Sequence, residues 1–469
     1  MSKTIRHDVV VLGAGPAGTA AAIRLAHLGI DVALVERACF PRRHVGICIA
    51  EETVNLLEFL GVAELFRSST PWRRALTAID WGPAGPQFVE QRGYHVDRGK
   101  LDLLLLTRAS DEGVTIYQPA RAMLSPAALE EGGYHCDLSV AGVSQRISCA
   151  FLIDAAGRRS ALPGARTKDS PPLIAIHADW RLRSNAPFDG LIEAGTDAWV
   201  WYAQTAKDRA TVSVFIDPRQ AKFCGGNSLR AGYERLLGQF PVLRSSLSGE
   251  RCSEVGACNA TSSHAVDVIG PHHIRVGDAC MSVDPLSSQG VHLALQSGIQ
   301  SAIIVNTILR RPAAAELARE FYRARIDERV TLFSRRMRDE YARVAARSRH
   351  PFWQERANGG IRGVYSMAKL RADPLPSDPG LRVRVATEAV MSSAPIIVGD
   401  FVERRGIVQH PDLVQPVAFL AGAHLPTLLQ ELPLAIGDLP KYWGDRVGEL
   451  KAWEIARWLW QRRILVEVI

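Results

Sequence analysis

Three glycines and one acid near the start of the chain have the types and spacing of a dinucleotide site. Gly13, Gly15 and Gly18 follow the first apolar run, 8–12, and Glu36 ends the next apolar run. A buried strand, a glycine turn, a helix and a second strand ending in an acid place a pyrophosphate on a helix N-terminus, with the acid on the ribose hydroxyls. The sequence therefore predicts that the chain binds FAD or NAD.

A second group of residues, far downstream, favours a flavin. Gly277 and Asp278 end a predicted strand, and a long helix is expected to begin near Gly290 and Val291. Asp278 could accept hydrogen bonds from ribityl hydroxyls, and free N–H groups at the helix start could stabilise the negative charge of a reduced flavin. NAD needs no such second anchor, so FAD is the predicted cofactor.

Two further segments could reach the cofactor. Segment 152–160 is an apolar strand ending in a turn that contains Gly157, and segment 96–102 places Arg98 at the start of a predicted helix. No Ser-His-Asp or His-Glu-x-x-His arrangement occurs in the sequence. The chemistry is therefore expected to come from the flavin itself.

Length and composition indicate a globular enzyme of more than one domain. The 469 residues are 47 % apolar and 22 % charged, which is ordinary for a folded protein. No charged-then-apolar leader and no membrane-spanning apolar run are seen, so a cytoplasmic protein is expected. The eight cysteines form no Cys-x-x-Cys pair, which predicts free thiols and no metal site.

The chain is basic, with a net charge of +7 and a pI near 9.1. Much of the excess comes from the arginine-rich stretch 310–349, in which acids are interleaved as on a solvated helix face. We therefore expect no nucleic-acid partner. An acidic protein or an anionic small molecule fits the charge better.

Four motifs together resemble the FAD-dependent monooxygenase superfamily with the para-hydroxybenzoate hydroxylase-like fold. They are, in family order, the glycine motif with Glu36, the stretch 40–46, the turn 154–160, and segments 277–278 and 284–291. The nearer likeness is to the branch of flavin-dependent halogenases, geranylgeranyl reductases and the flavoproteins of tryptophylquinone biogenesis. The resemblance implies an α/β fold: a Rossmann-like FAD-binding domain, an inserted antiparallel β-sheet substrate domain and a small C-terminal α+β domain.

The resemblance also implies where the domains lie. The FAD-binding domain is expected to be discontinuous (1–72, 95–165 and 265–340), the substrate sheet to comprise 73–94 and 166–264, and 341–372 to be a helical connection. In the remaining segment, 373–469, helix candidates followed by a terminal strand resemble a winged-helix module. We interpret it as a lid or a partner-docking element, since no positive run marks a DNA reader.

The expected site residues follow from these motifs. The predicted cofactor-binding positions are Gly13, Gly15, Pro16, Ala17, Gly18, Glu36, Arg37, Arg42, Val45, Arg98, Gly157, Gly277, Asp278, Pro285, Gly290 and Val291. The predicted substrate-pocket positions are Trp199, Trp201, Arg74 and Trp81. No catalytic residue is assigned; the candidates are His292, Cys48 and Trp201.

The halogenase branch uses a lysine on the segment before its Trp-Gly strand to relay hypohalous acid. Here that segment, 70–82, contains arginines, and no lysine occurs anywhere between Lys3 and Lys100. Arginine stays protonated and is a poor nucleophile, so it does not replace lysine in this role. Halogenation is therefore ranked below hydroxylation.

Two other family motifs are only partly kept. Trp199 and Trp201 match the W-x-W half of W-x-W-x-I-P, but the Ile-Pro half is absent. These tryptophans either wall the substrate space or simply pack within a strand. Where halogenases often have V-G-E-S, this chain has Val-Gly-Ile and then Cys48, whose thiol either contacts the flavin or packs as a small core residue.

The resemblance implies a flavin monooxygenase that hydroxylates an electron-rich aromatic ring through a flavin C4a-hydroperoxide. The best match is to the peptidyl tryptophan hydroxylases of tryptophylquinone biogenesis, which act in quinohemoprotein amine dehydrogenase maturation on a small, acidic protein partner within a maturation complex. The alternative is a hydroxylase of a free or carrier-tethered phenol, pyrrole or indole. A halogenase, an isoprenoid reductase and a non-catalytic flavoprotein scaffold rank lower.

The source of electrons stays open in the sequence. No second glycine fingerprint follows a strand elsewhere, so NAD(P)H either visits the flavin directly or acts through a separate flavin reductase. O2 is the expected co-substrate.

Overall fold

The computed structural model describes residues 4–42, 47–69, 72–125, 133–140, 143–184, 186–221, 229–358, 371 and 373–468. The chain divides into two units. One comprises residues 1–309 and 322–361, and the other comprises residues 310–321 and 362–469. Each unit has its own buried core.

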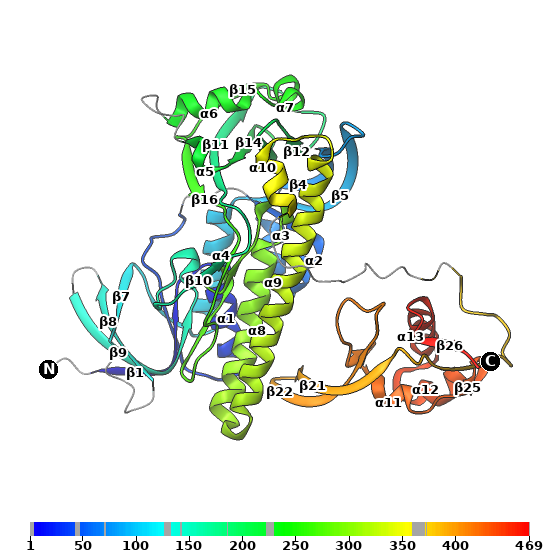
Figure 1. The fold of residues 1–469 in the computed structure, drawn as a ribbon. Helices are drawn as coiled ribbons and strands as arrows, with labels where there is room; N and C mark the ends of the chain where they lie inside the picture. Colours follow the sequence, from blue (N-terminus) through cyan, green and yellow to red (C-terminus); the bar gives the residue numbers. More distant parts are fainter. Residues whose placement is uncertain are drawn as a thin grey trace. The chain divides into compact units, whose positions relative to one another are not determined.

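A mostly parallel sheet carries the glycine turn (Figure 1). β1 (Ile5–Leu12) pairs in parallel with β2 (Val32–Val35) and with β9 (Val143–Asp154), and β6 (Thr115–Tyr117) and β18 (His273–Arg275) extend the sheet. The apolar runs of β1 and β2 are buried because both faces of a parallel sheet are covered.

Three helices accompany this sheet: α1 (Pro16–His27), α4 (Arg98–Asp111) and α8 (Gly290–Arg310). α8 approaches α1 closely at Gly298, where an added Cβ would lie 2.2 Å from the carbonyl oxygen of Ala17. Smaller elements complete the region: β7 (Ala120–Ser125), β8 (Tyr134–Val140), β10 (Arg166–Lys168), β17 (Ser263–Ala265), β19 (Met281–Ser282), α2 (Glu51–Phe59) and α3 (Ala63–Ser68).

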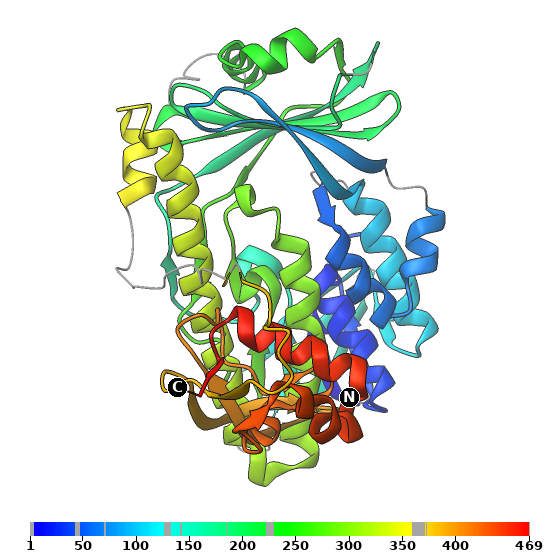
Figure 2. The ribbon, with the colours of Figure 1, turned by 90° about the vertical axis from the view of Figure 1, so that its right-hand side faces the viewer.

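A second, nine-stranded sheet lies as a broad layer in the same unit (Figure 2). All its neighbouring strands are antiparallel except β12 and β4. Its strands are β3 (Ile47–Ala50), β4 (Trp72–Asp80), β5 (Gln87–Val96), β11 (Ile174–Leu182), β12 (Gly190–Ala194), β13 (Ala198–Ala206), β14 (Arg209–Ile216), β15 (Gly249–Arg251) and β16 (Gly256–Asn259).

The two faces of this sheet pack differently because side chains alternate along each strand. Val200, Tyr202, Val212 and Val214 form a core with Phe240 on one face, where α6 (Leu229–Leu237) and α7 (Pro241–Ser246) lie (Figure 2). α5 (Pro218–Ala221) follows β14.

The opposite face meets long helices. Trp199 and Phe215 belong to a second cluster with Met337 and Tyr341 of α9 (Ala315–Ala345) and Trp353 of α10 (Pro351–Asn358).

The second unit is an α+β domain. β20 (Arg382–Val385) pairs with β25 (Leu434–Ala435) and β26 (Leu465–Glu467), while β21 (Val390–Val398) and β22 (Phe401–Gln409) form a hairpin. Its core surrounds Trp443 and Trp460. The remaining elements are β23 (Phe419–Leu420), β24 (Ala423–His424), α11 (Leu425–Leu429), α12 (Leu439–Val447) and α13 (Glu449–Gln461).

The predicted fold class is confirmed: a Rossmann-like domain, an additional sheet domain and a C-terminal α+β unit are present. The predicted domain boundaries and the winged-helix likeness stay predictions. No helix of the described residues is long and apolar enough to cross a membrane. In the same part of the chain, no group of three or more His, Cys, Asp or Glu is arranged to hold a metal ion.

Candidate active site

One cavity of about 740 Å³ joins the glycine turn of the parallel sheet to the nine-stranded sheet. The turns after β1 and β9, the starts of α1, α4 and α8, and the inner faces of β11, β13 and β14 all contribute to its wall. Most of the predicted site residues line it: Gly13, Gly15, Pro16, Ala17, Glu36, Arg37, Arg42, Cys48, Arg98, Gly157, Trp199, Trp201, Gly277, Asp278, Pro285, Gly290 and Val291.

The glycine turn has no room for a side chain at Gly13 or Gly18. Gly13 has φ +104°, and a Cβ added there would lie 2.5 Å from the carbonyl oxygen of Ala155. Gly18 does not line the cavity; a Cβ on it would lie 1.9 Å from the carbonyl oxygen of Gly13, so it serves the close packing of α1 on the turn. Gly15 precedes α1 without any side-chain cap, and the first turn of α1 holds no acid. The free N–H groups of this helix start therefore suit a phosphate.

Glu36 is held rigidly at the end of β2. It is 3 % exposed, and its two carboxylate oxygens accept hydrogen bonds from the backbone N–H groups of Ala14 and Ala38, both at 2.8 Å. Each oxygen keeps a further lone pair. The carboxylate can therefore still accept from a ribose hydroxyl, as the sequence predicted.

A buried carboxylate that the sequence analysis did not single out positions two of the predicted arginines. Asp102 of α4 is fully buried and accepts hydrogen bonds from Arg42 at 3.0 and 3.2 Å and from Arg98 at 2.9 and 3.1 Å. The spacing of four between Arg98 and Asp102 on one helix face was a signal that could have revealed it.

Three further arginines line the cavity without having been predicted, namely Arg121, Arg158 and Arg159. The Nε of Arg158 lies 3.4 Å from the carboxylate of Asp278, and its guanidinium donates to the carbonyl of Thr261 at 2.6 Å. With Arg37 and Arg42 they give the cavity a positive wall that suits the two phosphates of a dinucleotide.

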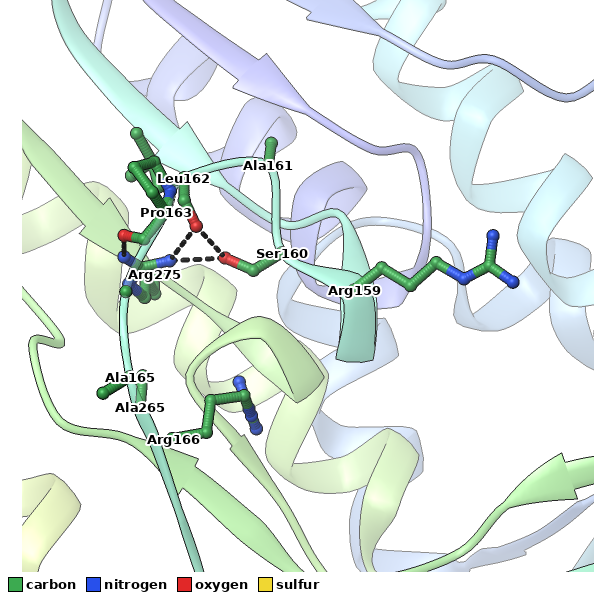
Figure 3. Close-up of a pocket in the computed structure, with 10 residues that line it drawn as sticks. Arg159, Ser160, Ala161, Leu162, Pro163, Ala165, Arg166, Ala265 and Arg275 are labelled. Atoms are coloured by element: carbon green, nitrogen blue, oxygen red, sulfur yellow. Dashed lines mark hydrogen bonds between the residues drawn. The ribbon is translucent and has the colours of Figure 1, made fainter.

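The turn that carries Gly157 is held by hydrogen bonds to Asp154 and Arg275, and Figure 3 shows those among Arg275, Ser160 and Leu162. The fully buried carboxylate of Asp154 accepts from the hydroxyl of Ser160 at 2.5 Å and from the N–H groups of Ala161 and Leu162 at 2.9 and 3.0 Å. Arg275 of β18 donates to Ser160 and to the carbonyls that follow it, Leu162 at 3.0 Å and Pro163 at 2.6 Å. These hydrogen bonds therefore hold the turn in a conformation in which the backbone of Gly157 faces the cavity.

The far end of the cavity is bounded by the loop before α8. Asp284 lines it and is almost fully buried, with the N–H of Leu286 and the hydroxyl of Tyr341 donating to it at 3.0 Å each. Burial raises the pKa of this carboxyl, and the two hydrogen bonds oppose the shift. Asp284 belongs to the predicted motif 284–291, but its burial and its contact with Tyr341 could not be predicted from the sequence.

The nine-stranded sheet supplies an aromatic wall. Trp199 and Trp201 come from β13, and Phe215 comes from β14. Trp199 stacks on Phe215, with ring centroids 3.8 Å apart and planes 11° from parallel. Such a flat apolar surface can pack against an aromatic substrate.

Trp81 and Arg74 were predicted to line the substrate pocket, but neither is among the described residues that line this cavity. Trp81 lies behind the wall, with its ring edge-on to Trp199 at 5.8 Å and its Nε1 donating to the carbonyl of Glu340 at 2.8 Å. It supports the aromatic wall and does not itself face the cavity. Arg74 belongs to β4, but its side chain lies outside the described residues, as does the predicted cofactor residue Val45.

The catalytic candidates are placed differently from one another. Cys48 is buried and lines the cavity beside the flavin-site residues, and Trp201 lines it on the sheet side. His292 is not among the described lining residues; its Nδ1 lies 3.2 Å from the hydroxyl of Thr53 on α2.

The position of His292 predicts a pH effect on stability. Burial, and to a lesser degree Arg329, lowers the pKa of His292 from its usual 6.5, while Glu52 opposes this shift. The unfolded chain then binds the proton more readily, so the free energy of unfolding falls as pH drops through the unfolded-state pKa. We expect His292→Gln to show a smaller loss of thermal midpoint than the parent between about pH 7.5 and about pH 5.5.

Thr53→Val is the matched control, because it removes the same contact without removing the titrating group. It should shift the midpoint equally at both pH values. An acid sensitivity that His292→Gln leaves unchanged would mean that other groups cause it.

The lining of the cavity fits FAD in its chemistry and leaves space for it. An added Cβ at Gly157 or Gly290 would meet nothing within 4 Å, so the backbone at both positions faces open space that a bound molecule can fill. Glu36 and Asp278 could hold ribose and ribityl hydroxyls, the arginines and the start of α1 could hold phosphates, and the start of α8 could face the flavin ring.

Comparisons with known proteins agree with this assignment. Residues 6–167 match the family model described as an FAD binding domain. The flavin-dependent halogenase ArmH2 of Armillaria mellea is 26 % identical over 366 residues, which is 70 % of each chain. The tryptophan 2-halogenase of Chondromyces crocatus is 26 % identical over 385 residues, covering 77 % of this chain and 73 % of the relative.

Two solved structures resemble nearly the whole chain. The flavin-dependent halogenase CmlS superposes with a TM-score of 0.80 at 20 % identity, covering 99 % of this chain and 96 % of its own. QhpG, described as a peptidyl tryptophan dihydroxylase essential for tryptophylquinone cofactor biogenesis, superposes with a TM-score of 0.71 at 26 % identity, covering 97 % and 99 %. The chain thus contains an FAD-binding domain and shares its fold with both classes.

Proposed function

We propose that this chain, which belongs to the FAD-dependent monooxygenase superfamily, hydroxylates an electron-rich aromatic ring, and that the ring is a tryptophan side chain in a small protein partner. One observation carries the proposal. The cavity connects the glycine turn at Gly13 with the aromatic wall at Trp199 and Trp201, and none of its described lining residues is a lysine.

The reaction needs little chemistry from the protein. Bound FAD, once reduced, supplies the activation of O2 and the transfer of one oxygen atom to the ring. The other oxygen atom leaves as water, with two electrons and a proton from NAD(P)H, used directly or through a flavin reductase, and a further proton from solvent. The chain must bind the cofactor, keep water out and hold the ring in reach.

The residues of the cavity can meet these demands. Trp199 and Phe215 form a dry aromatic surface, and both are at most 5 % exposed. Trp201 is only partly buried and lies edge-on to His95 at 6.2 Å, so it can contact an incoming ring. The aromatic wall would orient the substrate over the cofactor, and the clamped turn at Gly157 would hold the cofactor's other end.

The charge of the chain supports a protein substrate. The likeness to the peptidyl tryptophan dihydroxylase covers 97 % of this chain, but the likeness to the halogenase CmlS covers 99 %, so the shared C-terminal unit does not distinguish the two classes. The basic stretch 310–349 contains twelve arginines and six acids, which accounts for +6 of the net charge of +7 and would favour an acidic partner.

Halogenation is the second candidate, because the curated relatives reported above are halogenases. The chain lacks the feature that the family resemblance associates with that reaction. The aromatic wall carries no amine nucleophile among its described residues, and the arginines of the cavity remain protonated and cannot take the place of a lysine.

A direct competition between oxygen and halide distinguishes these two candidates. The purified holoenzyme would be supplied with a reduced-flavin source, isotopically labelled O2, excess bromide and indole compounds. Products that carry labelled oxygen and no bromine support hydroxylation. Brominated products would overturn the proposal in favour of the halogenase reading.

A further inference from the structure

The side-chain hydroxyl of Ser213, in the aromatic wall, has no hydrogen-bond partner within the described chain. Ser213 of β14 lines the cavity and is 1 % exposed, and its hydroxyl oxygen makes no hydrogen bond to any described residue. Nearly all buried hydroxyls in folded proteins are bonded, since leaving one unpaired costs about 1–3 kcal/mol. A hydroxyl that faces a binding cavity in this state suggests that a bound molecule completes it.

The surroundings of Ser213 narrow the kind of partner. In the register of the sheet it lies opposite Trp201 of β13 on one side and opposite His177 of β11 on the other. Its neighbours in the cavity wall are aromatic or small and apolar, namely Trp199, Phe215, Ala175 and Ala260. The hydroxyl therefore lies in a part of the cavity wall that is mostly aromatic or small and apolar, which suits a flat hydrophobic ring.

A second hydroxyl on the same strand offers a direct comparison with Ser213. Thr211 lies two residues earlier, on the same face of β14, and is also buried. Its hydroxyl donates to the carboxylate of Asp179 at 2.8 Å. The hydroxyl of Thr211 therefore has a hydrogen-bond partner within the protein, whereas the hydroxyl of Ser213 has none within the described chain.

We propose that Ser213 is a specificity-determining residue whose hydroxyl accepts a hydrogen bond from the ring N–H of an indole packed beside Trp201. This inference rests on the proposed function, which makes the substrate an electron-rich aromatic ring. Such a ring offers a donor on its heteroatom and no carbonyl. Once the ring leaves water, its N–H needs an acceptor, and Ser213 is the unpaired acceptor in that part of the wall.

Equilibrium titrations of the oxidised holoenzyme with indole and with 1-methylindole test the proposal, with perturbation of the flavin absorbance as the signal. The parent protein should bind indole about three- to tenfold more tightly than 1-methylindole, the worth of one hydrogen bond. Ser213→Ala should lose this preference by weakening indole alone. Because no internal bond is broken, its thermal midpoint should match or exceed that of the parent.

Thr211→Val is the matched control. It breaks the bond to Asp179, so it should lower the thermal midpoint while keeping the preference for indole. The two variants on one strand are thus expected to show opposite patterns in stability and in binding.

Three results would overturn the inference in different ways. A Ser213→Ala variant that keeps the parent's preference would show that Ser213 does not contact the ring N–H. A changed flavin spectrum or FAD affinity without any indole would assign the hydroxyl to the cofactor instead. If neither compound binds the parent protein, the indole substrate of the proposed function fails, irrespective of Ser213.

Discussion

Substituting Gly13 by alanine is expected to abolish tight FAD binding while leaving the protein folded. Gly13 has φ +104°, a conformation that costs an L-residue about 1–3 kcal/mol. The added Cβ would also lie 2.5 Å from the oxygen and 2.9 Å from the carbon of the Ala155 carbonyl. This carbonyl belongs to the backbone that follows β9, whose end pairs with β1, so it cannot yield without moving the turn.

The turn must shift, and the N-terminus of α1 shifts with it. We expect FAD affinity to fall by at least about 100-fold, equivalent to about 2.7 kcal/mol. Quenching of flavin fluorescence during titration of the apoprotein measures this directly. Gly113→Ala is the control, because Gly113 also has a positive φ of +84° but no atom within 4 Å of an added Cβ. Equal FAD affinity in the parent and in Gly13→Ala would contradict the assignment of this turn as the pyrophosphate site.

The second large effect, on both thermal stability and FAD affinity, is expected from substitution of Asp102. Replacing it by asparagine removes the negative charge that Arg42 and Arg98 share, and leaves two guanidinium groups facing each other through a neutral amide. Removing one partner of a buried ion pair costs about 3–5 kcal/mol. We expect a fall in the thermal midpoint of about 4–7 °C, together with weaker FAD binding, because Arg42 and Arg98 line the cavity.

The same substitution on the exposed side of the same helix provides the comparison. Asp111→Asn in α4 should leave both the midpoint and the FAD affinity unchanged. Calorimetry of the apoprotein isolates the effect on folding, and flavin titration isolates the effect on the cofactor. If Asp102→Asn behaved like Asp111→Asn, the cluster would be neither a structural nor a cofactor-positioning element.

The cofactor end of the site could be predicted because its information is local in the sequence. Gly13, Gly15 and Gly18 lie on one turn, and Glu36 ends the adjacent strand one crossover later. A parallel strand pair with a short crossover fixes the places of all four residues. The structure puts the first two glycines and Glu36 on one cavity wall, whereas Gly18, which was also predicted as a cofactor-binding position, serves the packing of α1.

The substrate end could be predicted only in part, because it depends on contacts between distant strands. The alternation along β13 places Trp199 and Trp201 on one face, but only the register with β14 brings Ser213 opposite Trp201. Trp81, taken from the sequence as a pocket residue, lies behind Trp199 because helix α9 supplies its hydrogen-bond acceptor, Glu340. No periodicity within one segment contains that information.

Charged residues that clamp the site were missed for the same reason. Asp154 and Arg275 are 121 positions apart and meet because β9 and β18 are paired strands. Arg158 and Asp278 meet across two separate turns. Sequence alone shows each of these residues as one charge among many, and only the sheet topology shows which ones converge.

The most direct test of the proposed function is the intact mass of a small tryptophan-containing protein partner that co-purifies with the flavoprotein. The mass would be measured before and after the complex is reduced and exposed to O2. We expect a gain of about 16 or 32 Da, one oxygen atom for each hydroxylation, located at a tryptophan. A partner whose mass stays unchanged while the flavin is reoxidised by O2 would contradict peptidyl hydroxylation.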